Sequence, residues 1–134
     1  MNYKILSTIV ILLAFIILLM LGLVTKIDNE VLTLHSPYRY SLNSSPLEIS
    51  GEIVGNWTFE ATFVLQLLDS NKDIIISKPI MVQGDWMTTN KVPFETIINF
   101  PEVNAQKGYL RFIKDNPSDI PEFDDHLDIP IFIW

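Results

Sequence analysis

The stretch of the chain richest in reactive side chains is an acidic segment, Lys114 to Asp125. It holds five carboxylates and two prolines in a chain that is 49% hydrophobic. Calcium takes about six to eight oxygen ligands, so carboxylates gathered in one loop could bind it, but the EF-hand spacing is not present. Pro117 and Pro121 stiffen this stretch, and the Asx and Ser side chains of "DNPS" can satisfy turn amides. The segment predicts a structured turn without metal, with a calcium-binding surface domain as the alternative.

Few residues are suited to catalysis. The histidines are His35 and His126, there is no cysteine, and the patterns of serine hydrolases, helical zinc sites and Gly-rich phosphate loops do not occur. Paired carboxylates can hydrolyse glycosides. Candidates for such a pair are Glu60, Asp85, Asp115 and Glu122. Because a domain of about 100 residues offers little room for a cleft, the sequence predicts a protein that is not an enzyme and uses no cofactor. A carbohydrate-active enzyme is the second alternative.

Two tryptophans, Trp57 and Trp86, lie in segments rich in turn residues. Either indole could anchor a ligand. An aromatic side chain that begins a strand, however, more often closes the end of a sandwich core. Packing is therefore the preferred interpretation for both, and ligand contact is the alternative.

The net charge of the chain limits the kinds of partner that it can bind. Sixteen acidic residues against nine basic ones give a formal net charge of -7. Such a field repels phosphate backbones, and no cluster of Lys and Arg offsets it locally, so nucleic-acid binding is not expected. The lack of cysteine excludes disulfides, cysteine-ligated zinc and a lipoprotein anchor. The domain must be stabilised by its hydrophobic core alone.

The elements that position these residues begin with an apolar run, Ile5 to Val24, that carries no charge. At about 1.5 Å per residue, such a run spans roughly 30 Å of hydrocarbon, which is one bilayer crossing. A cleaved signal peptide is the alternative, but its apolar region runs about 7 to 15 residues and ends in a cleavage site that this sequence does not offer. We expect a single-pass anchor in the cell membrane, with the N-terminus inside and the rest of the chain outside the cytoplasm. Residues 1–30 are predicted to form the anchor and a short linker.

From Val31 onward, apolar and polar residues alternate with period two, as half-buried strands require. One expected face holds Leu47, Ile49, Gly51 and Ile53, and the next holds Phe59, Ala61, Phe63, Leu65 and Leu67. Seven strands are expected at residues 31–34, 47–53, 59–67, 74–82, 92–100, 108–115 and 127–134. The sequence therefore predicts an all-β domain over residues 31–134, an immunoglobulin-like β-sandwich of about seven strands. A small closed barrel is the alternative.

Three stretches are more distinctive than core packing requires: "GNWTFEATF" from Gly55, "GDWMTTNKVPF" from Gly84 and "KDNPSDIPE" from Lys114. In this order and spacing they resemble the immunoglobulin-like domain of bacterial spore-germination proteins. The likeness covers Ser45 to Trp134 and implies a bacterial, extracytoplasmic binding or scaffolding domain without known catalytic activity. The chain departs from the family pattern at Asp119, where the family often has Gly.

Strand direction predicts where these stretches lie. If the seven strands alternate, the connections after the second, fourth and sixth strands meet at one end of the sandwich, which we call the loop pole. They are "GNW", "QGDWMTTNK" and "DNPSDIPEFDDH". Loops at one end of a rigid sandwich commonly carry binding function. The candidate binding residues there are Trp57, Glu60, Asp85, Trp86, Asp115, Asn116, Asp119, Glu122, Asp124 and Asp125.

Further expectations concern the surroundings of the loop pole. Asp85 and Asp115 are expected to cap amides of neighbouring loops, with Trp86 covering the core and the acidic segment outermost. Because the first expected strand begins at this pole directly after the anchor, the loop pole is expected to lie close to the membrane. The expected partners are the membrane, through the helix, and an envelope protein or cell-wall component. The sequence does not predict an oligomeric state.

Overall fold

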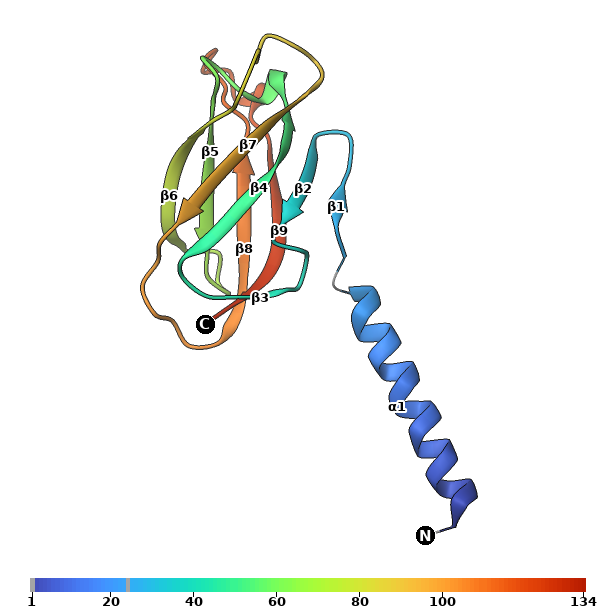
Figure 1. The fold of residues 1–134 in the computed structure, drawn as a ribbon. Coiled ribbons are helices and arrows are strands. Elements are labelled where there is room, and N and C mark those ends of the chain that lie inside the picture. Colours follow the sequence, from blue (N-terminus) through green and yellow to red (C-terminus); the bar gives the residue numbers. More distant parts are fainter. Residues whose placement is uncertain (1, 24) are drawn as a thin grey trace.

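The structure, a computed structural model, describes residues 2–23 and 25–134. One apolar helix precedes a sandwich of two β-sheets (Figure 1). The helix is α1 (Tyr3–Leu23). The strands are β1 (Ile27–Asp28), β2 (Leu32–Ser36), β3 (Leu42–Asn43), β4 (Leu47–Val54), β5 (Thr62–Leu68), β6 (Ile74–Met81), β7 (Lys91–Ile98), β8 (Gln106–Ile113) and β9 (His126–Ile133). Two short 3-10 helices, η1 (Gly55–Trp57) and η2 (Pro121–Phe123), lie in loops.

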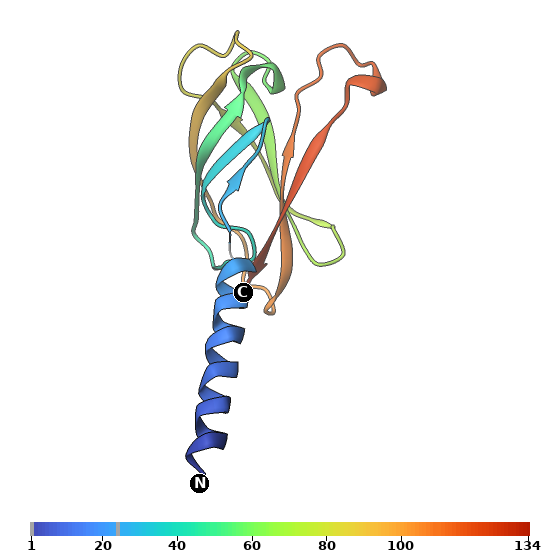
Figure 2. The ribbon, with the colours of Figure 1, turned by 90° about the vertical axis from the view of Figure 1, so that its right-hand side faces the viewer.

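Helix α1 has the length and composition of a membrane span from Tyr3 to Leu21, and none of that window is buried against the sandwich. Figures 1 and 2 show it projecting away from the sheets. A helix that is apolar on all sides and has no protein partner would expose its side chains to water unless lipid covered them. The predicted apolar run ends at Val24, which, like Met1, lies outside the described residues.

The sandwich consists of a four-stranded sheet in the order β1-β2-β4-β7 and a five-stranded sheet in the order β3-β9-β8-β5-β6. Period-two alternation turns the apolar side chains of β4 and β5 inward, including Ile49, Ile53 and Leu65. Phe63 of β5 and Phe94 of β7 join the two sheets, with ring centroids 5.1 Å apart, and Phe112 stacks beside them. The chain therefore folds as the predicted immunoglobulin-like sandwich.

The seven long strands, β2 and β4 to β9, fall where the sequence predicts them, and the structure adds the two-residue strands β1 and β3. The strand expected from residue 59 begins three residues later than predicted. Phe59 is exposed and precedes a turn, and β5 begins only at Thr62. The residues between, Glu60 and Ala61, both have positive φ, as a tight two-residue hairpin turn requires.

Strand β1 overturns one prediction. It lies inside the expected linker and pairs antiparallel with β2, Ile27 opposite Leu34, so the chain reverses before the first long strand. Ile27 is buried in the core, and Thr25 O accepts a hydrogen bond of 3.0 Å from Arg39 N, at the end of the sandwich opposite the loop pole. The helix therefore leaves the sandwich at this opposite end. The expectation that the loop pole lies close to the membrane assumed that the chain enters the sandwich at that pole directly after the helix, and this assumption was wrong. The predicted boundary between residues 30 and 31 falls inside the β1–β2 connection.

Side chains fasten this hairpin to the sandwich. The Thr33 hydroxyl donates a hydrogen bond of 2.7 Å to Asp28 Oδ1, and the Lys91 ammonium lies 3.1 Å from the same oxygen. These two hydrogen bonds lower the pKa of Asp28 from its ordinary value. The path of the chain from helix to sandwich is thus held by side-chain hydrogen bonds as well as by the β1–β2 pairing.

Candidate functional site at the loop pole

The three predicted loops lie at one end of the sandwich, and residues 55–57 connect the other two. Gly55 N donates a hydrogen bond of 3.0 Å to Asn90 O in the loop between β6 and β7. Asp115 N donates one of 2.9 Å to Trp57 O. Figure 2 shows the tip of the acidic segment standing away from the β6–β7 loop. The three loops are therefore hydrogen-bonded to one another close to the strands, whereas the tip of the acidic segment lies apart from the β6–β7 loop.

Gly55 permits the close approach of two of these loops. A Cβ atom at this position would lie 2.2 Å from Trp86 O and 2.4 Å from Thr88 O, distances that no real Cβ contact shows. Only glycine fits while the backbones remain this close.

The two tryptophans of the pole pack rather than project. Trp57 is 5% exposed and belongs to the core. Trp86 is half-buried against the core and contacts Phe59 edge-to-face, with ring centroids 6.1 Å apart. Both side chains cover the end of the hydrophobic core, which agrees with the preferred interpretation of the sequence.

The acidic segment is organised by one side chain, Asn116. Its amide group donates hydrogen bonds of 2.8 Å to Ile120 O and to Asp124 Oδ1, and its carbonyl oxygen accepts from the amide and hydroxyl of Ser118. Ser118 Oγ in turn accepts from Ile120 N. The loop is thus ordered by its own polar groups, and residues 117–126 remain exposed.

Asp119 has a φ of +56°, in the left-handed region that favours glycine. Asp is one of the few residues with a side chain that tolerates this conformation. Asp119 can therefore adopt the left-handed conformation of this turn without glycine.

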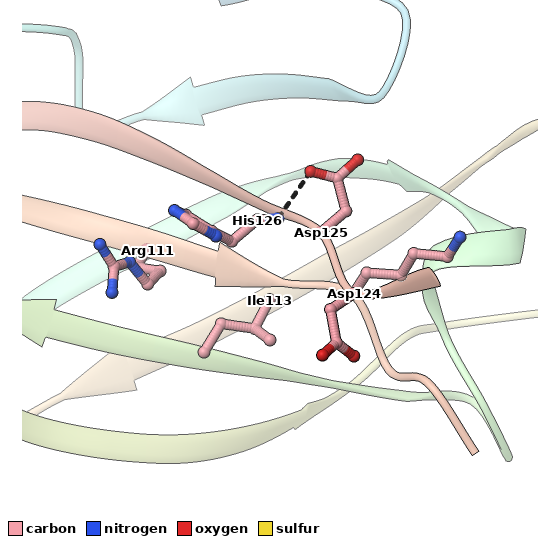
Figure 3. A pocket seen from close by; sticks show the side chains of 6 residues that line it. Arg111, Ile113, Asp124, Asp125 and His126 are labelled. Carbon is pink, nitrogen blue, oxygen red and sulfur yellow. Dashed lines mark hydrogen bonds between the residues drawn. The ribbon is translucent and has the colours of Figure 1, made fainter. Parts of the chain in front are cut away.

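An open hollow of about 320 Å³ lies at the base of the acidic segment, where β8 ends and β9 begins (Figure 3). Its lining residues are Arg111, Ile113, Lys114, Asp124, Asp125 and His126. The Asp125 carboxylate accepts a hydrogen bond of 2.8 Å from His126 N, drawn as a dashed line in Figure 3. The hollow mixes negative charges on exposed side chains with positive charges on the half-buried Arg111 and Lys114, and it is open to solvent. Such a hollow suits a polar contact at a surface better than an enclosed reaction site.

The carboxylates do not gather. Over residues 2–23 and 25–134, no group of three or more acidic or histidine side chains is placed to hold a metal ion. Asp85 accepts a hydrogen bond of 3.0 Å from Met87 N in its own loop, not from a neighbouring loop as expected. Asp115 contributes its backbone amide to the contact with Trp57. Glu60 and Glu122 lie on separate loops and are exposed.

The strongest ion pair lies beside the hollow, between the strands that carry the acidic segment. Arg111 of β8 donates two hydrogen bonds, of 2.7 and 2.8 Å, to Asp128 of β9, and Lys72 donates a third of 3.0 Å. The bond from Arg111 is the main cause that lowers the pKa of Asp128 to about 2, and the same pairing raises the pKa of Arg111. Arg111 is therefore engaged and has less capacity for a ligand.

Sequence reasoning missed the apolar residues of the pole. They are Phe59, Met87, Ile120 and Phe123, all exposed. Met87 and Ile120 stand within runs of turn residues, "DWMTTN" and "PSDIPE", and an apolar residue in such a run has no strand to turn it inward. That signal was available in the sequence. The same signal applied to Phe123, which stands between Glu122 and Asp124 in the acidic segment. For Phe59 it was not available, because Phe59 adjoins an apolar pattern that predicts burial.

Comparison with known proteins gave one match. A family model described as the immunoglobulin-like domain of bacterial spore germination matches residues 31–120, more than half of the 134-residue chain. The matched region extends from before β2 to within the acidic segment, and it includes Trp57, Trp86 and Asn116. No curated protein and no solved structure matches the chain.

Proposed function

Because the chain belongs to the family of immunoglobulin-like domains of bacterial spore germination, we propose that it is a membrane-anchored domain outside the cytoplasm that binds an envelope protein through its loop pole. The anchor is α1, with the N-terminus in the cytoplasm. The role is binding or scaffolding, and no reaction is assigned to it. Its link to germination rests on the family alone.

The observation that carries this proposal is that the helix and the three loops lie at opposite ends of the sandwich. The helix leaves the sandwich at the end where Thr25 contacts Arg39, whereas the three loops lie at the other end. With α1 in a bilayer, the sandwich would hold the loop pole away from the lipid. Loops displayed at the far end of a rigid sandwich are well placed to meet another protein.

The surface of the loop pole suits a protein partner. Met87 is 75% exposed and Phe123 is 53% exposed, and acidic residues lie near each in the sequence, Asp85 before Met87 and Glu122 and Asp124 on either side of Phe123. Protein interfaces are enriched in aromatic residues and Met at their centres and are polar at their rims. Acidic rims steer basic partners and disfavour anionic ones. An envelope protein with a basic, partly apolar surface therefore fits better than an anionic wall polymer.

The test is photo-crosslinking in intact bacteria with the full chain. A photoreactive amino acid replaces Met87 or Phe123 at the loop pole, or Ile97 as an exposed control on β7. We expect crosslinks to one envelope protein from the first two positions and none from the third. Fractionation and external protease treatment of the same cells report whether the chain is anchored and exposed outside.

A matched pair of charge variants tests the acidic rim. Glu122→Gln with Asp124→Asn and Asp125→Asn removes three charges from the acidic segment but keeps the acceptor oxygens that its turn uses. The control removes three exposed charges elsewhere: Glu48→Gln, Glu95→Gln and Glu102→Gln. We expect the first variant to lower the crosslink yield several-fold at low salt and the second to leave it unchanged. Equal yields from both, or crosslinks to wall glycan alone, would argue against an envelope-protein partner.

A further inference from the structure

The end of the sandwich opposite the loop pole, which we call the helix-side pole, carries a patch of exposed apolar and aromatic residues. Its members are Tyr38, Leu42, Phe132 and Trp134. Leu42 is 76% exposed and Trp134 is 58% exposed, values that decide against a role in the core. In monomeric soluble proteins, exposed apolar side chains gathered in this way mark an interaction surface.

The strand pairing explains why these side chains gather. Ile131 and Ile133 of β9 are buried, so Phe132 between them points outward. Strand β3 runs parallel to β9 with Leu42 opposite Phe132, and Trp134 N donates a hydrogen bond of 3.2 Å to Asn43 O. Residues more than eighty positions apart thus form one surface.

The patch lies where the helix joins the sandwich. Arg39, next to Tyr38, donates its backbone N–H to Thr25 O. Residues 24–26 alone separate Leu23, the end of α1, from Ile27 of β1, and so short a connection spans at most roughly 14 Å. Both views of the ribbon place residue 134 at this end of the molecule (Figures 1 and 2). A bilayer that holds α1 would therefore lie within reach of the patch.

The charges beside the patch also suit a lipid surface. Lys107 lies 5.8 Å from the centroid of the Tyr40 ring, and Lys26 is exposed directly after the helix. Arg39 Nε is buried without a hydrogen-bond partner among the described residues. One acidic residue, Glu102, also lies beside the patch, where it lines a hollow together with Trp134. The acidic segment lies at the other pole, where its repulsion from anionic lipid would favour the same orientation.

We propose that the patch of Tyr38, Leu42, Phe132 and Trp134 rests in the headgroup region of the membrane that α1 crosses, with Lys26 and Lys107 toward anionic lipid headgroups. Tyr and Trp favour this region because their rings are amphipathic, and Lys and Arg extend their charges into it. The inference rests on the proposed anchor. It adds that the sandwich contacts the bilayer in a fixed orientation and does not swing freely on the short connection to α1.

The test uses the full chain in vesicles of phosphatidylethanolamine and phosphatidylglycerol that contain a lipid with a nitroxide near its headgroup. Because the chain has no cysteine, a fluorophore can be placed at one introduced cysteine in each variant. The patch variants are Leu42→Cys and Trp134→Cys, the loop-pole controls are Met87→Cys and Phe123→Cys, and Leu13→Cys reports insertion of the helix. We expect the nitroxide lipid to quench the patch labels several-fold more strongly than the loop-pole labels.

A double variant supplies a matched control. Tyr38→Ser with Phe132→Ser should reduce the quenching at Trp134→Cys, whereas Phe59→Ser with Met87→Ser, the same kind of change at the loop pole, should not. Circular dichroism checks that both variants fold.

The outcomes separate this inference from the proposed function. If a deep bilayer quencher reaches Leu13→Cys but the patch labels are quenched no more than the loop-pole labels, the anchor stands and the inference is overturned. Disulfide formation between two copies at Leu42→Cys in place of quenching would assign the patch to a second copy and also overturn it. If Leu13→Cys is not reached, the proposed anchor fails, and the inference fails with it.

Discussion

The two poles of the sandwich differ in chemistry although one set of strands builds both. The loop pole has long connections, a turn ordered by Asn116 and most of the acids of the acidic segment on its surface. The helix-side pole has exposed side chains such as Leu42 and Trp134, with cations beside them. Strand direction explains why the three loops share one end, since every second connection goes to the same end. The parallel pairing of β3 with β9 explains why the apolar patch forms at the other end. Both ends expose apolar side chains, but acidic residues accompany those of the loop pole and cations accompany those of the helix-side pole.

The largest expected effect compares one tryptophan from each pole. Trp57→Ala should lower the free energy of unfolding by about 3 to 5 kcal/mol, because it leaves a cavity at the end of the core. Trp134→Ala should change it by less than about 0.5 kcal/mol, because that side chain is exposed. Guanidinium denaturation of the full chain in detergent measures both. Equal losses would mean that the two poles do not differ in packing as described.

A smaller effect tests how closely the loops of the loop pole approach. Gly55→Ala should lower the free energy of unfolding by about 1 to 3 kcal/mol, because the added methyl group meets two backbone carbonyl oxygens that must move apart. Asn56→Ala is the control, since Asn56 is exposed next to it. Limited proteolysis of residues 83–91 should become faster in the first variant only. Unchanged stability for Gly55→Ala would contradict the contact between these loops.

The smallest effect concerns the ion pair between β8 and β9, which supports the acidic segment. The pKa of Asp128 is lowered to about 2 in the folded chain, so the pair stabilises the fold above about pH 4 and loses this contribution as the pH falls toward 2. Asp128→Asn should therefore lower the free energy of unfolding by about 1 to 2 kcal/mol near pH 7, with the difference shrinking in acid.

Urea denaturation at several pH values measures that difference, with Glu95→Gln on an exposed face of β7 as the control. The control should track the unmodified chain at each pH. A deficit for Asp128→Asn that stays constant from neutral to acid conditions would show that its pairing with Arg111 does not stabilise the fold through charge.

Much of the fold could be read from local pattern. The alternation in residues 47–53 predicts β4 with Ile49 and Ile53 inward, and the structure agrees. Strands β1 and β3 could not be found in this way, because two residues are too few to show a period. Missing β1 reversed the predicted position of the loop pole relative to the helix, since one added strand changes the end at which the chain enters.

The candidate site was predictable in kind more than in detail. Turn residues in the acidic segment indicate an ordered, exposed loop, and the structure has one. That Asn116 holds Asp124, or that Arg111 holds Asp128, depends on which residues face each other across β8 and β9. The exposure of Phe59 likewise depends on a turn at Glu60 and Ala61. Neither residue is a glycine, so the sequence gives no sign that a turn with positive φ occurs there.

Sequence pattern was enough to predict the apolar helix, the all-β character of residues 31–134 and the grouping of the three loops, because hydrophobicity and its period can be recognised locally and strands that follow one another alternate in direction. The tertiary structure alone decided which pole adjoins the helix and which distant residues share a surface. The patch of Tyr38, Leu42, Phe132 and Trp134 exists because a two-residue parallel pairing sets β3 beside β9. Such pairings are contacts between distant parts of the chain, and a local pattern contains no record of them.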